Sequence, residues 1–199
     1  MGPTIAVLLA AGESRRMRQL KALLPWQGST LLEHQVTALL EGGVDRVMVV
    51  VVHRASELKA KLKCKDRVSC TLNPDYLQGK TTSLKAGLRA VEEFQPGVVL
   101  ILNVDQPRRP ETIRDLLQHH LAGESLITIP TFNGKGGHPI AIASELLPEV
   151  GSIEEESEGL KAVTRRHQKS TARVELGTPE ILWDLNTPED YQAALHPEI

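Results

Sequence analysis

Over about the first 130 residues, short apolar runs alternate with stretches of helical periodicity. Five runs have the length and composition of strands: Ile5–Leu9, Arg46–His53, Val68–Asn73, Val98–Val104 and Leu126–Pro130. Between them, leucines, valines and isoleucines recur three and four positions apart, which predicts helices around 31–40, 58–62, 84–91 and 113–121. Strands separated by helices indicate right-handed crossovers. We therefore expect one α/β domain over residues 1–199, a Rossmann-like three-layer sandwich with a mainly parallel sheet.

The pattern is less regular after this region. An apolar run at Ile140–Ala143 follows a glycine-rich turn, residues 160–167 have helical spacing, and short strands are expected at 173–176 and 181–185. Pro188 and the acids after it predict the start of a last helix. Ligands of parallel sheets bind beyond the carboxyl ends of the strands, so we look for chemistry in the loops that follow them.

Composition and charge exclude several classes of protein. With 23 basic and 25 acidic residues the net charge is -2, and aromatic residues make up only 3%, so neither bulk electrostatics nor base stacking favours nucleic-acid binding. No apolar run is long enough to span a membrane, and no secretory signal is visible. The two cysteines, Cys64 and Cys70, make neither a disulfide framework nor a zinc site. We expect a cytoplasmic protein that binds neither nucleic acid nor membrane.

The loop after the first strand combines small residues, a hydroxyl group and positive charge. Gly12 allows close approach of the backbone to a ligand, and Ser14 can donate a hydrogen bond to a phosphate. Four cations lie within seven residues: Arg15, Arg16, Arg18 and Lys21. A solvated basic loop would have the same composition, but its position after the first strand favours phosphate binding.

These residues carry a family resemblance. The run Leu9–Met17, followed by Lys21-Ala22-Leu23-Leu24-Pro25, resembles the signature loop of the nucleotidyltransferases. It is most similar to the MobA-like group, closest to its molybdenum cofactor cytidylyltransferases, which implies a nucleotide-diphospho-sugar transferase-like fold. Further segments resemble this group in the expected order: Asn73–Tyr76 with Gly79 and Ser83, Asp105–Pro107, Gly137–Pro139 and Asp184–Asp190.

The resemblance implies a set of site residues for transfer of a nucleoside monophosphate to a phosphorylated acceptor, with release of pyrophosphate. It implies catalysis by Arg16 and Lys21, Mg²⁺ binding by Asp105 and Asp184, and an acceptor contact from His138. Asn186 is a substitute for Asp184 as the second metal ligand. The nucleotide would be bound by Leu9, Ala10, Ala11, Gly12, Ser14, Gly79 and Ser83. Arg18 and Lys80 depart from the family pattern.

Structural explanations stand beside several of these roles. Asp105 could cap the helix begun by Pro110 or pair with Arg108 or Arg109, and Asp184–Asp190 has the composition of a turn and helix cap. Thr81 or Thr82 could cap the helix that contains Ser83. A lone histidine before proline, such as His138, is more often structural.

Three other functions fit parts of the sequence. Gly79-Lys80-Thr81 ends like a P-loop, but Pro74 occupies the position of its first glycine. A serine hydrolase would need a closing glycine where Arg16 stands. A nucleotide sensor of the same fold would not need Lys21 and Asp105.

The first loop also bears on substrate choice. Relatives with Ala-Ala-Gly here resemble pyrimidine users, and the methyl group of Ala11 disfavours a large base. The expected substrates are CTP rather than GTP and a phosphorylated acceptor such as molybdopterin, with a sugar phosphate as the alternative acceptor. A transient contact with a molybdoenzyme or its chaperone would follow from that product.

Overall fold

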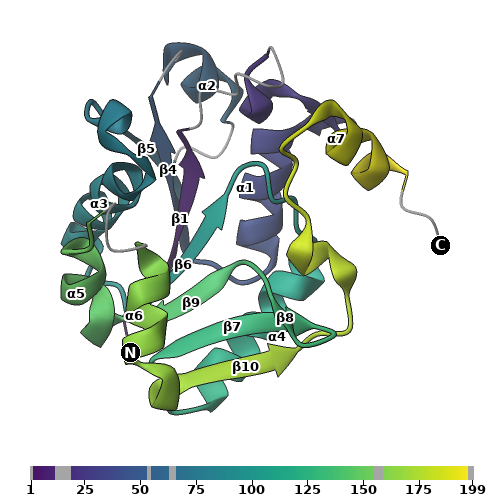
Figure 1. Ribbon diagram of the computed structural model, residues 1–199. Coiled ribbons are helices and arrows are strands. Elements are labelled where there is room, and N and C mark those ends of the chain that lie inside the picture. Colours follow the sequence, from purple (N-terminus) through teal and green to yellow (C-terminus); the bar gives the residue numbers. More distant parts are fainter. Residues whose placement is uncertain (1, 12–18, 53–54, 63–65, 155–158, 197–199) are drawn as a thin grey trace.

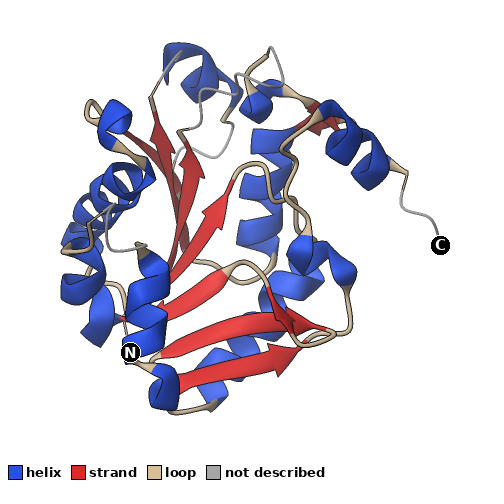
Figure 2. Cartoon of the chain, in the orientation of Figure 1, coloured by secondary structure: helices blue, strands red, loops and turns tan. Residues whose placement is uncertain are grey.

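A computed structural model describes residues 2–11, 19–52, 55–62, 66–154 and 159–196. A central mixed sheet has helices on both faces (Figures 1 and 2). Three of the predicted nucleotide and phosphate contacts, Gly12, Ser14 and Arg16, lie outside the described residues. The described helices include none long and apolar enough to cross a membrane.

The sheet has the strand order β10-β7-β9-β6-β1-β4-β5, with β8 paired to β7. Its strands are β1 (Thr4–Ala10), β4 (Arg46–Val51), β5 (Val68–Leu72), β6 (Val98–Asn103), β7 (Ile127–Phe132), β8 (Lys135–Gly136), β9 (Ile140–Ala143) and β10 (Thr171–Glu175). β1 lies between β4 and β6 and is parallel to both, with Leu8 opposite Val49 and Leu102. Among the described strands of this sheet, only β8 and β9 run antiparallel to the direction of the others. The predicted, mainly parallel α/β fold is confirmed.

Alternation along the strands explains why helices cover both faces. On β1, Ala6 and Leu8 point into one apolar layer, whereas Ile5 and Val7 point into the other. The first layer is covered by α1 (Leu31–Glu41), α2 (Ala55–Lys61) and α4 (Pro110–Ala122). The second is covered by α3 (Lys80–Val91), α5 (Leu147–Gly151) and α6 (Leu160–Arg166). Strands buried on both faces read as continuous apolar runs, which is how the sequence revealed them.

A smaller apolar cluster, which we call the closing cluster, joins the two ends of the chain. It contains Leu24, Trp26, Leu31, Leu185, Tyr191 and Ala194. Trp26 lies in the short hairpin of β2 (Pro25–Trp26) and β3 (Ser29–Thr30), and Tyr191 lies in α7 (Pro188–Leu195). Figure 1 shows α7 beside this early part of the chain. The closing cluster therefore packs the segment after Lys21 against the segment after Asp184.

Helix starts follow the expected capping chemistry at α1 and α7. Thr30 and Thr187 each form a capping box, with Glu33 and Asp190 respectively. α7 begins at Pro188 as predicted.

One predicted strand is wrong. Residues 181–185 form no strand; instead a 3-10 helix, η8 (Pro179–Leu182), leads into an irregular segment. The carbonyl oxygens of Ile181 and Trp183 accept hydrogen bonds from the buried Arg108 guanidinium, so they are not free for a strand ladder.

Candidate active site

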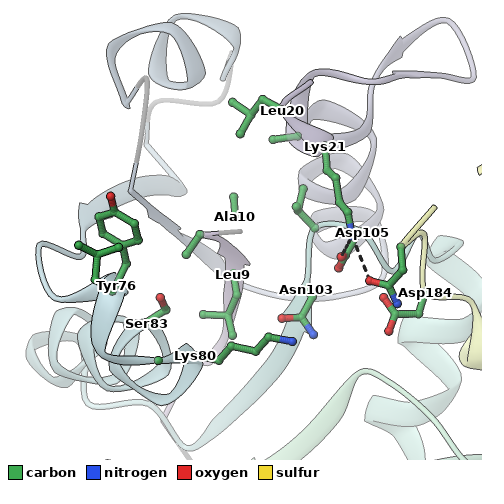
Figure 3. A pocket seen from close by; sticks show the side chains of 16 residues that line it. Leu9, Ala10, Leu20, Lys21, Tyr76, Lys80, Ser83, Asn103, Asp105 and Asp184 are labelled. Carbon is green, nitrogen blue, oxygen red and sulfur yellow. Dashed lines mark hydrogen bonds and ion pairs between the residues drawn. The ribbon is translucent and has the colours of Figure 1, made fainter. Parts of the chain in front are cut away.

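A cavity of about 640 Å³ opens at the carboxyl ends of β1 and β6 (Figure 3). Most of the predicted site residues that the structure describes line it: Leu9, Ala10, Ala11, Lys21, Gly79, Ser83, Asp105 and Asp184. They come from opposite ends of the chain, because parallel strands bring their carboxyl ends to one edge of the sheet. The fold therefore gathers the candidate ligand-binding residues around this cavity.

Lys21 and Asp105 form the charged centre of this cavity. The Lys21 Nζ lies 2.6 Å from Oδ2 of Asp105 and 3.1 Å from Oδ1 of Asn186. The side chains of this ion pair are only 13% and 19% exposed. Lys21 begins the 3-10 helix η2 (Lys21–Leu23), and Asp105 lies in the loop after β6. The ammonium is therefore held in place by groups far away in the sequence.

The pairings that sequence reasoning offered for Asp105 are wrong. Arg109, not Asp105, is the N-cap residue of α4, and that end of the helix has no side-chain cap. Arg109 pairs with Glu180 at 2.6 Å, and Arg108 bonds to backbone carbonyls. The carboxylate of Asp105 instead faces the cavity and Lys21.

Asp184 lies beside this pair on a segment tied to the same loop. The backbone N–H of Leu185 donates to the carbonyl oxygen of Asp105 at 2.9 Å. Asp184 and Asn186 both line the cavity, and Figure 3 shows the side chain of Asp184 next to Asp105. Two carboxylates and an amide oxygen are the hard oxygen donors that suit Mg²⁺. Among the described residues no group of three or more His, Cys, Asp or Glu side chains could hold a metal, so phosphate oxygens and water would have to complete its shell.

The opposite wall is the start of α3. Gly79 is its N-cap residue and has a φ of 122°, a backbone conformation that favours glycine. Neither Thr81 nor Thr82 caps the helix, so that expectation is wrong; the hydroxyl of Thr82 donates to the carbonyl oxygen of Gly79 at 2.7 Å. Asn73 anchors this wall, since its Nδ2 donates to Thr82 Oγ1 and to Ser83 Oγ, both at 2.9 Å.

Sequence reasoning missed part of the lining. It did not foresee Leu20, Leu77, Asn103 or Val104, it included Ala22 and Tyr76 only as members of segments that resemble the family, and it noted Lys80 only as a departure from the family. Asn103 could have been found, because it ends β6 two positions before Asp105. Its Nδ2 donates to Oε1 of Gln106 at 3.1 Å, so this amide is oriented by its own loop.

His138 lies outside the cavity lining. Its Nδ1 is 3.3 Å from Nε2 of Gln106, and its carbonyl oxygen accepts from Nε of Arg108. Burial, and then the charge of Arg108, lowers the pKa of His138 to about 4. The imidazole is therefore neutral near pH 7, and within the described part of the chain Gln106 and Asn103 connect it to the cavity.

This chain is similar to known proteins over most of its length. The family described as the MobA-like NTP transferase domain matches residues 6–171. The molybdenum cofactor cytidylyltransferase of Escherichia coli K12 is 29% identical over 94% of this chain and 93% of its own length. The purine catabolism protein PucB of Bacillus subtilis is 30% identical over the same shares of the two chains.

Solved structures extend the likeness to the whole fold. Rv0371c of Mycobacterium tuberculosis aligns over 98% of this chain and 97% of its own, with a TM-score of 0.83 and 22% identity. Its complex with manganese aligns with a TM-score of 0.79 at 21% identity, over 98% of this chain and all of that one. A nucleotidyl transferase from Methanothermobacter thermautotrophicus aligns with a TM-score of 0.81 at 27% identity, over 96% and 95% of the two chains.

Proposed function

Since this chain belongs to the MobA-like NTP transferase family and is a nucleotidyltransferase, we propose that it transfers CMP from CTP to a phosphorylated acceptor of the molybdopterin type. An oxygen of the acceptor phosphate attacks the α-phosphorus of the NTP. The bond from that phosphorus to the bridging oxygen of the β-phosphate breaks, and pyrophosphate leaves with the bonding electrons. The acceptor becomes a phosphoanhydride-linked dinucleotide.

One observation carries this proposal: Lys21, Asp105 and Asp184 converge on a single cavity from three separate segments. Both reactants are anions, so the site must offset their repulsion before they can meet. Asp105 and Asp184 would hold Mg²⁺, with Asn186 as the substitute for Asp184. When bound, the metal supplies positive charge to the triphosphate and helps to orient it.

Lys21 supplies the positive charge that belongs to the chain itself. Asp105 and Asn186 hold its ammonium at the cavity wall, where it can bind the charge that develops on the α-phosphate and on pyrophosphate. By family resemblance, Arg16 in the loop after β1 adds a forked donor to the same phosphates. Gly12 and Ser14 of that loop would approach the phosphates through the backbone and hydroxyl group.

The nucleoside would lie between β1 and the start of α3. Leu9, Ala10 and Ala11 line one side of this space, and Gly79 and Ser83 line the other. The methyl group of Ala11 favours cytosine over guanine by about 1–3 kcal/mol, the usual value of one methylene-sized difference in a pocket. The name of the Escherichia coli relative supports the same base and the same acceptor.

The family resemblance is the basis for placing the acceptor. We assign His138 to that side, acting through Gln106 on the Asn103 amide at the cavity. A molybdopterin product would also require a transient contact with the molybdoenzyme that receives it, or with that enzyme's chaperone.

The test is pyrophosphate release by the full chain. CTP, GTP, ATP and UTP are supplied in turn with Mg²⁺, with and without a molybdopterin acceptor, and the dinucleotide formed is identified by mass. The proposal expects acceptor-dependent release that is fastest with CTP and absent in Asp105→Asn. A preference for GTP would refute the base assignment alone. Release with a sugar phosphate and none with molybdopterin would refute the acceptor alone, and no release under any condition would refute the reaction.

A further inference from the structure

Arg108 joins the two segments that carry the candidate metal ligands. Its side chain is buried, with 1% of the residue exposed. Nε donates to the carbonyl oxygen of His138, Nη1 to that of Pro107 and Nη2 to that of Ile181, each at 2.8 Å. Both terminal nitrogens also approach the carbonyl oxygen of Trp183, at 3.4 and 3.3 Å. One guanidinium thus spans the loop after Asp105 and the peptide that precedes Asp184.

Arg108 has no carboxylate within hydrogen-bonding distance among the described residues. Burial lowers its pKa to about 9, against the opposing charges of Glu180, Asp184 and Asp105 in that order. It is therefore charged near pH 7. A buried cation costs more than an apolar side chain of the same size, so packing alone does not explain it. Two of the three acids that favour the charge are the candidate metal ligands.

Gln35 of α1 fixes the same loop from the other side. It is fully buried, and its Nε2 donates to the carbonyl oxygens of Gln106 at 2.5 Å and Asn103 at 3.3 Å. Its Oε1 accepts from the backbone N–H of Arg108 at 3.2 Å. The backbone of Arg108 is thus held by α1. This fixes the position from which the Arg108 guanidinium donates to the carbonyl oxygen of Trp183.

We propose that Arg108 is a positioning residue that sets how far apart the Asp105 and Asp184 carboxylates lie, so that both bind one divalent cation. This inference rests on the proposed function. The planar fork is needed for the role, because it donates to several carbonyl oxygens at once in a fixed geometry. A lysine ammonium is a compact point charge and cannot reproduce that geometry.

The test is direct binding of Mn²⁺ to the full chain, followed by electron paramagnetic resonance with a non-hydrolysable CTP analogue present. Arg108→Lys keeps the charge, and Arg108→Met keeps much of the volume. Removing partners that orient metal ligands commonly weakens metal binding by about 10- to 100-fold, and we expect a loss of that size in both variants. In Arg108→Lys the KM for CTP at saturating Mg²⁺ should stay within about two-fold, because the nucleotide walls on β1 and α3 are unchanged.

Leu117→Ala is the matched control for lost stability. Leu117 is buried in α4, the helix that begins two residues after Arg108, and it does not line the cavity. This variant should melt earlier yet bind Mn²⁺ as the unmodified chain does. If Arg108→Met fails to fold, Arg108→Lys alone decides.

Two results would overturn the inference, and they are distinguishable. If Asp105→Asn loses Mn²⁺ binding while folded Arg108→Lys keeps it, Arg108 does not position the ligands and the proposed metal site stands. If Asp105→Asn also binds Mn²⁺ normally, the metal site of the proposed function fails and the inference fails with it.

Discussion

Gly87→Ala tests how closely α3 must lie on the sheet. Gly87 faces the sheet from the middle of this helix, and a Cβ at that position would meet Cγ1 of Val7 and lie 2.9 Å from Cγ2 of Val50. Both valines are fully buried in the central strands β1 and β4. A branched side chain in a packed strand has no free rotamer to move into, so the helix itself must shift.

Two opposing effects decide the sign of the change in stability. Alanine in place of glycine inside a helix stabilises it by about 1 kcal/mol. Overpacking a core costs about 1–3 kcal/mol, and two simultaneous overlaps with fixed side chains put this site at the upper end. The net loss is then about 2 kcal/mol. For a domain of this size, about 2–4 °C per kcal/mol converts that loss to a melting temperature lower by roughly 4–8 °C.

Urea unfolding followed by circular dichroism measures the difference, and Gly151→Ala is the control. Gly151 is the last residue of α5, and a Cβ there meets nothing within 4 Å, so this variant should be neutral or slightly more stable. Because the start of α3 lines the cavity, Gly87→Ala should also raise the KM for CTP. If Gly87→Ala proves as stable as the unmodified chain, or more so, helix propensity outweighs the contact and the packing argument is refuted.

Three further outcomes are expected. Lys21→Ala should lower kcat by about 10²- to 10³-fold, the usual effect of removing one transition-state charge contact, while circular dichroism shows an intact fold; normal turnover would show that Lys21 does not stabilise the transition state. As the pH falls from 6.5 to about 4, the unfolded chain takes up a proton at His138 that the folded chain does not, so the free energy of unfolding should fall by about 3 kcal/mol. His138→Gln should flatten the pH dependence of urea unfolding, and an unaltered slope would contradict the lowered pKa of His138. Ala11→Gly should reduce the ratio of kcat/KM for CTP over GTP by about 10-fold in single-substrate assays, and an unchanged ratio would show that its methyl group does not select the base.

The strands of the central sheet could be predicted because they are buried on both faces. The run 98–104 contains only apolar residues and one asparagine, and the strand β6 covers Val98–Asn103. The run 181–185 is similarly apolar but forms no strand. Its carbonyl oxygens are used by Arg108, which is 73 positions away from Ile181, and no local pattern carries that information.

Some features of the candidate site could likewise be predicted from the sequence, and others could not. Lys21 and Asp105 could be singled out because they follow strands and match family motifs. Their direct contact could not, since it joins residues 84 positions apart and depends on the packing of η2 against the loop after β6. The hydrogen bond from the Asn73 amide that orients Ser83 could not be predicted for the same reason, because it joins the end of a strand to the next helix.

The closing cluster has a consequence for the order in which the protein becomes functional during synthesis. Trp26 leaves the ribosome early, but its aromatic neighbour Tyr191 is translated 165 residues later, and Asp184 and Asn186 only just before it. Chains fold from the N-terminus as they emerge, so the central strands can pair while the segment with Asp184 and Asn186 is still inside the exit tunnel. A nascent chain would hold the sheet and lack the site. A chain released before residue 184 would carry Lys21 and Asp105 but lack Asp184 and the Asn186 amide that helps to hold the Lys21 ammonium.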